Sequence, residues 1–396
     1  MAPAKTLDLF SGTGGLAYAL RGGIARTVAF CEVYPGARSI LRGNMGRKWI
    51  ERAPIEEDVL AIDPSKYKGV ELIAGGFPCV GMSSAGKREG LKNPASALFY
   101  RVVELVDTIR PPLVFLENVA NVVSLALEEI VHQLHGRLGY ELRWVVVPAY
   151  VAGAPQLRSR WFLLAVRPGY AREWTLTSES NRPFDWSSGG VPDRMVPLGT
   201  DGDLATVKLR FGALGNGVVP DAVRLAFLFL ASGGRVRSLK DAPTTLRLQP
   251  MDVEGLGAVG LKAKGPFRKG GFVLQGAGNA MGNRGAWFPD PFAAVPKPDL
   301  GLRLVPLGSA AADNPAISTA LIGDERRLRA WGTPRHGNTG ACAVLTFRCT
   351  KDLPSQMKFE AGTPAKQRGA GFRPSVAFVE WLMGVPPGFT EPAAKK

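Results

Sequence analysis

The stretch Leu7–Gly15, "LDLFSGTGG", joins an apolar strand to a helix through a turn rich in glycine. Gly12, Gly14 and Gly15 have no Cβ, so the backbone of this turn can come close to a ligand. A strand, a glycine-rich turn and a helix in this order open the nucleotide-binding half of many doubly wound α/β proteins. Taken alone, the turn is also compatible with a purely structural role, so the flanking sequence has to decide.

Outward from this turn, segments typical of strands and helices alternate as far as residue 167. Because helices separate the strands, the pattern predicts a doubly wound sheet of parallel strands. Ligands on such sheets bind beyond the carboxyl ends of the strands. The strands are expected at residues 5–10, 24–33, 69–76, 111–119, 140–149 and 160–166, and the helices at 14–23, 34–44, 96–110 and 124–139.

The charge of the chain points to a polyanionic partner. Its 396 residues include 49 Lys and Arg against 34 Asp and Glu, a net charge of +15. A basic globular protein of this kind most often binds nucleic acid. Between residues 233 and 275, eight basic residues accompany three acidic ones, which predicts a basic surface there, although a solvated charge run would look the same.

Cysteine and histidine usage argues against a disulfide framework and against a metal site. The four cysteines, at 31, 79, 342 and 349, show no C-x-x-C spacing, and there are only three histidines. The first residues contain no apolar signal region, and no run approaches the ~18 apolar residues that a membrane span needs. We therefore expect an intracellular protein whose thiols stay reduced, with no metal and no membrane partner.

Two acidic residues favour an adenosine ligand at the glycine turn. Glu32 lies 20 residues after Gly12, at the end of the second strand, where it can accept hydrogen bonds from both ribose hydroxyls. Asp58 lies near the position of the third strand and could accept from an adenine amino group. The turn lacks the lysine and the Ser or Thr of a phosphate-binding loop. This favours adenosine carried on a sulfonium, S-adenosylmethionine, over a dinucleotide.

A single thiol follows the next strand, in "GGFPCVGMSSAGKREG" (75–90), and other reactive groups share its edge of the sheet. Cys79 comes directly after the strand, and Glu117 and Asn118 end the strand after it. Gln156, Arg158 and Arg160 alternate at the entry to the last strand, so their side chains point to one face. Each group has a plainer reading: a small core residue, a helix cap or an exposed strand face.

Thiol, carboxyl and guanidinium together suit methyl transfer to C5 of cytosine. This carbon is too electron-poor to accept a methyl group unaided, and a thiolate adding at C6 makes it nucleophilic. A carboxyl group hydrogen-bonded to N3 stabilises the charge that this addition pushes into the ring. The base must also leave the helix stack, which requires a protein that grips phosphates.

Five segments resemble, in order, motifs of the cytosine-5 DNA methyltransferases. They are "DLFSGTGG", "GGFPCVGMSSAGKREGL", "ENV", "QLRSRWF" and "LGNGVVP". The resemblance implies a Rossmann-like S-adenosylmethionine-dependent methyltransferase fold with a smaller target-recognition domain, and methylation of cytosine in a specific double-stranded DNA sequence. It implies that Cys79 is the nucleophile, that Glu117 contacts N3, and that Arg158 and Arg160 support the flipped base and the active-site loop.

The same resemblance implies two sets of binding residues. The cofactor contacts would be Phe10, Gly12, Gly14, Glu32, Asp58, Pro78, Leu98, Asn216 and Val218. The substrate contacts would include Ser83, Asn118 and Gln156.

The sequence departs from the family pattern in two ways. Val80 and Met82 stand where the family usually has Gln and an aromatic residue, and Leu157 replaces a common Arg. Only a short segment separates "QLRSR" from "LGNGVVP", where most of the family inserts its recognition region. We therefore expect a catalytic domain at 1–167, completed by 206–232, a connector at 168–205, and a basic recognition and tail region at 233–396.

Two parts of that last region, "WGTPRHGNTGA" (331–341) and "FVEWLMGVPPGFT" (378–390), resemble tail segments of methyltransferases carried by phages and similar mobile elements. Arg335, His336 and Asn338 are candidates for contacts with bases or phosphates, whereas the Trp of "EWLMG" is expected to pack within the tail.

Other functions remain open at this point. Transfer RNA could replace DNA as the substrate, or the chain could be a catalytically silent DNA-binding protein. A redox role for Cys79 is disfavoured because no resolving cysteine lies nearby in sequence. We expect a monomer that binds double-stranded DNA, with S-adenosylhomocysteine as a product. A cognate restriction endonuclease that acts independently, as in restriction-modification, is a further partner that the resemblance allows.

Overall fold

The computed structural model describes residues 2–78, 97–156, 158–178, 182–186, 192–193, 195–197, 202–250, 271–276, 302–306 and 372–394. Cys79, Ser83, Arg335, His336 and Asn338 lie outside these described residues.

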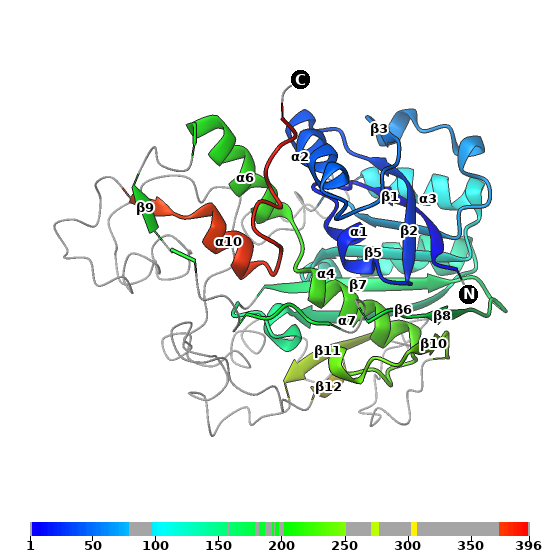
Figure 1. Cartoon of the computed structure of the whole chain (residues 1–396). Helices are drawn as coiled ribbons and strands as arrows, with labels where there is room; N and C mark the ends of the chain where they lie inside the picture. The colour runs from blue at the N-terminus through cyan, green and yellow to red at the C-terminus, as the bar shows by residue number, and fades with distance from the viewer. Residues whose placement is uncertain are drawn as a thin grey trace.

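A nine-stranded sheet forms the centre of the molecule, with the strand order β12-β11-β6-β7-β5-β4-β1-β2-β3 (Figure 1). The strands and helices expected up to residue 167 are present, and the doubly wound α/β fold is confirmed. The strands are β1 (Ala4–Leu9), β2 (Ala25–Cys31), β3 (Ile55–Glu56), β4 (Leu72–Gly76), β5 (Leu113–Val119), β6 (Glu141–Pro148), β7 (Ser159–Val166), β11 (Gly271–Gly276) and β12 (Leu302–Pro306).

The expectation of an all-parallel sheet is wrong at β7. The strands β1 to β5 pair in parallel, but β7 runs antiparallel to both β5 and β6, between which it is inserted. A short 3₁₀ turn, Ala149–Ala152, joins β6 to β7 instead of a helix, and strands joined by a short connection run antiparallel. As a result, the start of β7 lies at the carboxyl edge of its parallel neighbours.

Helices cover both faces of the sheet (Figure 1). On one face, α1 (Gly15–Leu20) and α7 (Pro220–Ala231) pack with the sheet in one hydrophobic cluster. On the other, α3 (Leu98–Ile109), α5 (Leu127–Val131) and the π-helix His132–Arg137 form a second cluster. The helix α2 (Pro35–Gly46) follows β2, and the short α4 (Val122–Leu125) follows β5. Each face of the central strands is therefore buried, which explains their nearly continuous apolar sequence.

One stretch of the described residues, Leu204–Ala231, is long and apolar enough to cross a membrane by length and composition alone. The structure breaks it into α6 (Leu204–Asn216) and α7, and every residue of α7 is buried in the fold. The stretch is not a continuous apolar run, since it contains Lys208, Arg210, Asp221 and Arg224. Burial of α7 against the sheet explains the apolar character of this stretch, as is common for core helices.

The region beyond residue 167 contributes more to the core than its composition suggests. The helix α6 was not expected as a helix; it begins after Asp203, whose carboxylate accepts a hydrogen bond from the backbone N–H of Thr206 at 2.9 Å. Near the C-terminus, α10 (Val376–Leu382) packs in the same hydrophobic cluster as α1 and α7. The remaining described strands form two antiparallel pairs. These are β8 (Glu173–Thr175) with β10 (Thr245–Arg247), and β9 (Met195–Pro197) with β13 (Phe372–Pro374). The domain boundaries given above stay predictions.

A buried ion pair fixes α7 against α1. Arg224 contacts Asp221 at 3.1 Å and also donates to the carbonyl of Ala19, while Asp221 accepts from the backbone N–H of Phe184 at 2.6 Å. We expect Arg224→Leu to lower the free energy of unfolding by about 3–5 kcal/mol, because it leaves the Asp221 carboxylate buried without its counter-charge. Urea unfolding of the purified variant measures this change.

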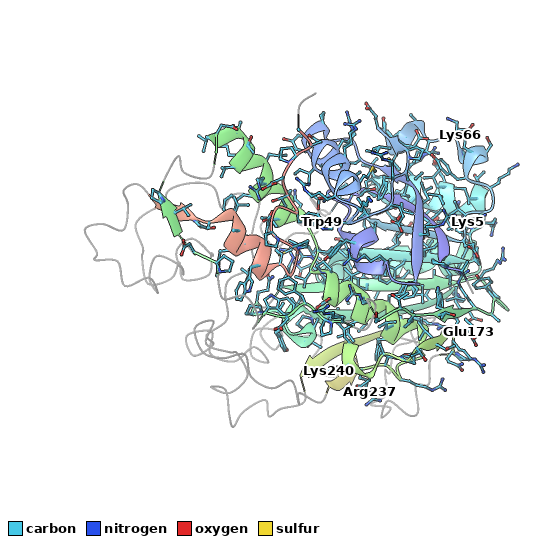
Figure 2. The ribbon with its side chains drawn as sticks, viewed as in Figure 1. Lys5, Trp49, Lys66, Glu173, Arg237 and Lys240 are labelled. Atoms are coloured by element: carbon cyan, nitrogen blue, oxygen red, sulfur yellow. The ribbon has the colours of Figure 1, made fainter. Side chains whose placement is uncertain are left out.

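The control for this substitution is Arg247→Leu, which removes an ion pair to Glu173 that is exposed at the rim of the molecule (Figure 2). It should change the free energy of unfolding by less than about 1 kcal/mol. Equal losses in the two variants would contradict a special role for the buried pair.

Candidate active site

The carboxyl ends of β1, β4 and β5 and the start of β7 meet at one edge of the sheet. Leu9 pairs in register with Gly75, Gly76 with Glu117, and Val119 with Arg160. This edge therefore brings together three segments that are far apart in sequence: the glycine turn, the strand that leads to Cys79, and the "ENV" strand. It is the position at which doubly wound sheets bind their ligands.

The glycine turn is fixed by its own hydrogen bonds. The hydroxyl of Ser11 donates to the carbonyl of Asp8 at 2.7 Å and accepts from the backbone N–H of Cys31 at 3.1 Å. Phe10 has a φ of +54°, which is uncommon for a residue with a Cβ. This backbone conformation turns the chain directly after β1. The turn is thus tied to the end of β2 before any ligand binds.

Glu32 joins this turn to β2 and keeps room for a ligand. One carboxylate oxygen accepts from the backbone N–H of Gly12 at 2.7 Å, and the other accepts from the backbone N–H of Tyr34 at 2.8 Å. An ionised carboxylate offers about four acceptor positions, so two remain for ribose hydroxyls. Asp58 caps the 3₁₀ turn Val59–Ala61 by accepting from Leu60 at 2.9 Å.

The negative charges of Glu32 and Asp58 both act on the thiol of Cys31 at the end of β2. Burial, together with the negative charges of Glu32 and Asp58, raises the pKa of the Cys31 thiol to about 12. Cys31 therefore stays a neutral, buried thiol, and the contact of Glu32 and Asp58 with adenosine stays a prediction.

Asp8 is a buried acid for which sequence reasoning assigned no role. It lies on β1 two residues before Phe10, and among the described residues neither of its carboxylate oxygens has a hydrogen-bond partner. Burial raises the pKa of Asp8 well above its usual range, and the negative charges of Glu51 and Glu32 raise it further. The signal that could have revealed it is an acid inside an otherwise apolar strand.

The residues at this edge fit S-adenosylmethionine. Asp8 is a buried acid beside the glycine turn, where the backbone of Ala17 in α1 only partly offsets its raised pKa, and such an acid suits a ligand that carries positive charge. Free acceptor positions on Glu32 suit a ribose. Phe10 and Leu98 pack at the rim of one hydrophobic cluster, where they offer an apolar surface at the same edge.

The late "LGNG" segment closes against the glycine turn. A Cβ placed on Gly15 would lie 2.9 Å from a methyl group of Val218, so the two segments are in contact. The side chain of Arg158, which is only 2% exposed, donates to the carbonyl of Gly215 at 2.8 Å and to that of Gly217. In this structure Arg158 holds the turn that carries Asn216 and Val218; its support of a flipped base stays a prediction.

Glu117 and Arg160 form a partly buried ion pair at the centre of the edge. The guanidinium Nε of Arg160 lies 3.0 Å from a carboxylate oxygen of Glu117, and the two side chains are 17% and 12% exposed. Burial raises the pKa of Glu117, and the positive charges of Arg160 and Arg158 offset only part of this. A carboxyl group with a raised pKa can hold the proton that a hydrogen bond to N3 of cytosine requires.

Asn118 and Gln156 make contacts within the protein. The amide of Asn118 donates to the carbonyl of Phe77 at 3.1 Å, so Asn118 fixes the backbone just before Pro78 and Cys79. Gln156 is fully buried and donates to the carbonyl of Leu382 at 2.7 Å. Both side chains were expected to contact substrate; that contact stays a prediction, and the structure gives each of them a positioning role.

Comparison with known proteins shows the family to which the chain belongs. A family model described as C-5 cytosine-specific DNA methylase matches residues 4–192. The chain is 30% identical over 385 residues to the Type II methyltransferase M.CviJI of Paramecium bursaria Chlorella virus IL3A, and the match covers 96% of both chains. The chain belongs to the C-5 cytosine-specific DNA methylases.

Other members of the family match only part of the chain. M.MspI of Moraxella sp. is 30% identical over 166 residues, covering 41% of this chain and 38% of its own, and M.HhaI of Haemophilus parahaemolyticus is 29% identical over 166 residues, covering 41% and 49%. Among solved structures, a DNA modification methyltransferase of an E. coli prophage is 24% identical with a TM-score of 0.38, covering 48% of this chain and 56% of its own.

Substitutions at two neighbouring glycines of β4 are expected to affect different properties, activity at Gly76 and stability at Gly75. A Cβ on Gly76 would lie 2.7 Å from the Glu117 carboxylate, whereas a Cβ on Gly75 would lie 2.9 Å from the backbone carbonyl of Leu9. We expect Gly76→Ala to push the Glu117 carboxylate aside and lower kcat by about 100-fold, with a small change in Tm.

The matched variant Gly75→Ala should instead lower Tm strongly, because a backbone carbonyl cannot move aside as a side chain can. Steady-state methylation kinetics and thermal unfolding measure the two effects. If Gly76→Ala kept full turnover, the position assigned to the Glu117 carboxyl would be wrong.

The raised pKa of Asp8 predicts a pH dependence of cofactor binding. In the free protein, the contribution of protonated Asp8 to stability is complete below the ordinary carboxyl pKa of about 4 and is lost as the pH rises through its folded pKa. A cationic cofactor favours the ionised form, so its affinity should rise with pH across the folded pKa. Asp8→Asn should bind the cofactor more weakly and with a flat pH profile, as measured by calorimetry over a pH series. An equally steep profile in the variant would contradict this role.

Proposed function

We propose that this protein methylates C5 of cytosine in a specific double-stranded DNA sequence, through a covalent bond between Cys79 and C6 of a base turned out of the duplex. The observation that carries the proposal is the partly buried Glu117–Arg160 ion pair, which lies beside the end of the strand that leads to Cys79. Family membership supports S-adenosylmethionine-dependent cytosine-5 methylation. The flipped base and the covalent adduct are our inference from chemistry.

The reaction requires a proton and an electron pair to move at defined atoms. The thiolate of Cys79 adds to C6, and the Glu117 carboxyl protonates N3, so the electron pair of the C5–C6 double bond becomes available at C5. S-adenosylmethionine supplies the methyl group and leaves as S-adenosylhomocysteine. Loss of the C5 proton to a base then expels the Cys79 thiolate, and N3 returns its proton to Glu117.

The other residues of the site hold these groups in place. Arg160 fixes the Glu117 carboxyl, Asn118 fixes the backbone before Cys79, and Arg158 seats the late turn. The cofactor would be held by Phe10, Gly12, Gly14, Glu32, Asp58, Pro78, Leu98, Asn216 and Val218, with Asp8 facing its charged end.

The net charge of +15 supports a polyanionic substrate, because each phosphate contact needs a basic side chain. We assign contacts with DNA to Ser83, Arg335 and Asn338, outside the described residues. The protein would act as an intracellular, DNA-associated monomer. The relatives M.CviJI, M.MspI and M.HhaI are Type II methyltransferases, which supports DNA as the substrate. A metal is not part of the proposed reaction.

The decisive test uses DNA that carries 5-fluorocytosine in the target sequence. Fluorine at C5 cannot leave as a proton does, so the covalent adduct should accumulate on the wild-type protein in the presence of S-adenosylmethionine and be located on Cys79 by mass spectrometry. Cys79→Ser should form no adduct and transfer no methyl group, while it still binds DNA and cofactor.

A parallel arm with transfer RNA in place of DNA distinguishes the nucleic acid substrate. Methylation of transfer RNA alone would overturn the assignment to DNA. Turnover by Cys79→Ser would overturn the covalent mechanism.

A further inference from the structure

The C-terminal segment, residues 372–394, packs against the cofactor edge of the catalytic domain. We propose that it is a brace that positions the cofactor site, and we call it the C-terminal brace. The inference rests on the proposed function, since it concerns the S-adenosylmethionine site described above. It assigns these residues a role other than the DNA recognition for which the region 233–396 was considered.

A buried carboxylate organises the brace. Glu380 of α10 is 1% exposed, and it accepts hydrogen bonds from the backbone N–H groups of Gly388 and Thr390, each at 2.8 Å, and from the hydroxyl of Thr390. Arg210 of α6 pairs with the same carboxylate at 2.9 Å. Glu380 therefore fixes the loop after α10 to α10 itself and to α6.

The loop then carries an aromatic side chain to the first helices of the catalytic domain. Phe389 stacks on Trp49 with a centroid distance of 5.7 Å and meets the ring of Tyr18 edge-on at 5.2 Å. Figure 1 shows the red chain after α10 running beside α2, and Figure 2 labels Trp49 in this part of the molecule. Farther along, Ala393 donates to the carbonyl of Ser39 in α2 at 3.0 Å.

Both residues that Phe389 contacts are connected to the glycine turn by hydrogen bonds, Tyr18 directly and Trp49 through Asn44. The backbone N–H of Tyr18 donates to the carbonyl of Gly14 at 2.9 Å. The backbone N–H of Trp49 donates to the carbonyl of Asn44, whose side-chain amide donates to the carbonyl of Thr13 at 2.9 Å. One wall of the cofactor site is thus supported by the brace.

The opposite wall is supported through α6. Arg210 lies on α6. This helix ends at Asn216, and the chain then leads to Val218, which contacts Gly15. Gln156, two residues before Arg158, is also tied to the brace through the carbonyl of Leu382. The brace therefore joins the two segments that must close around the cofactor.

The charge and burial of the brace argue against contact with DNA. Its sequence holds one arginine, Arg373, against Glu380 and Glu391, so it offers a polyanion no net attraction. The side chains of Trp381, Phe389 and Thr390 are buried within the fold. A segment whose large and polar side chains face inward suits support of a neighbouring site better than readout of bases.

The test compares two variants at the contacts of the brace with a third variant at a core ring of the same segment, all in the full-length protein. Phe389→Leu removes the ring contacts with Trp49 and Tyr18, and Glu380→Gln removes the charge that pairs with Arg210. If either leaves the cofactor walls correctly placed in only a tenth of the molecules, the Kd for S-adenosylhomocysteine rises about tenfold. Calorimetry measures this Kd, and steady-state kinetics should show a raised KM for S-adenosylmethionine with kcat nearly unchanged.

The control is Phe378→Leu, the same substitution on α10 at a fully buried ring that packs on Trp381. It should lower Tm as Phe389→Leu does, yet leave the Kd for S-adenosylhomocysteine unchanged. DNA affinity, measured by fluorescence anisotropy, should stay within about twofold of wild type in all three variants, because no DNA contact is removed.

Two results would overturn the proposed role of the brace. One is an unchanged Kd for S-adenosylhomocysteine in folded Phe389→Leu. The other is a loss of DNA affinity in Phe389→Leu or Glu380→Gln while the affinity for the cofactor stays intact. Should Glu380→Gln not fold, Phe389→Leu decides alone. Wild-type protein that binds no S-adenosylhomocysteine would instead refute the proposed function, so the two failures can be told apart.

Discussion

The site depends on the direction of one strand. Because β7 runs antiparallel between β5 and β6, its first residues lie at the carboxyl edge of the parallel strands, and Arg160 comes into register with Val119. In a parallel orientation the same arginine would lie at the opposite edge, a full strand length from Glu117. The ion pair that holds the Glu117 carboxyl therefore exists because the turn between β6 and β7 is too short for a helical crossover.

This strand also shows how far the sequence could predict the molecule. Alternation of strands and helices correctly predicted the elements up to residue 167, and the spacing between Gly12 and Glu32 correctly placed an acid against the glycine turn. The convergence of Glu117 and Arg160 was predicted from motifs, whereas the parallel sheet that was predicted beside it could not have produced that convergence. Strand direction is set by the length of a connection, and periodicity does not report it.

Buried polar side chains with distant partners were the harder part. Gln156 and Leu382 are 226 residues apart, and Arg210 and Glu380 are 170 apart. Nothing in the local pattern of either partner indicates the other, since such pairs form only after the core has brought their helices together. An arginine or glutamine in a family motif was therefore assigned to the substrate, when its described contacts are with the backbone of the protein itself. Asp8 differs, because an acid within an apolar strand is visible locally and only its role was missed.

Acidic residues lie together at the glycine turn although the chain as a whole is basic. A chain with a net charge of +15 nevertheless places Glu51 and Glu32 near Asp8, whose pKa is raised first by burial and then by these two negative charges. Under the proposed function, a bound sulfonium would favour the ionised form of Asp8, whereas these carboxylates would repel a polyanion. Transfer of the methyl group converts the sulfonium into a neutral thioether. An attraction between ionised Asp8 and the sulfonium would then weaken at the moment when the product has to leave, so Asp8 would favour the donor over the spent cofactor.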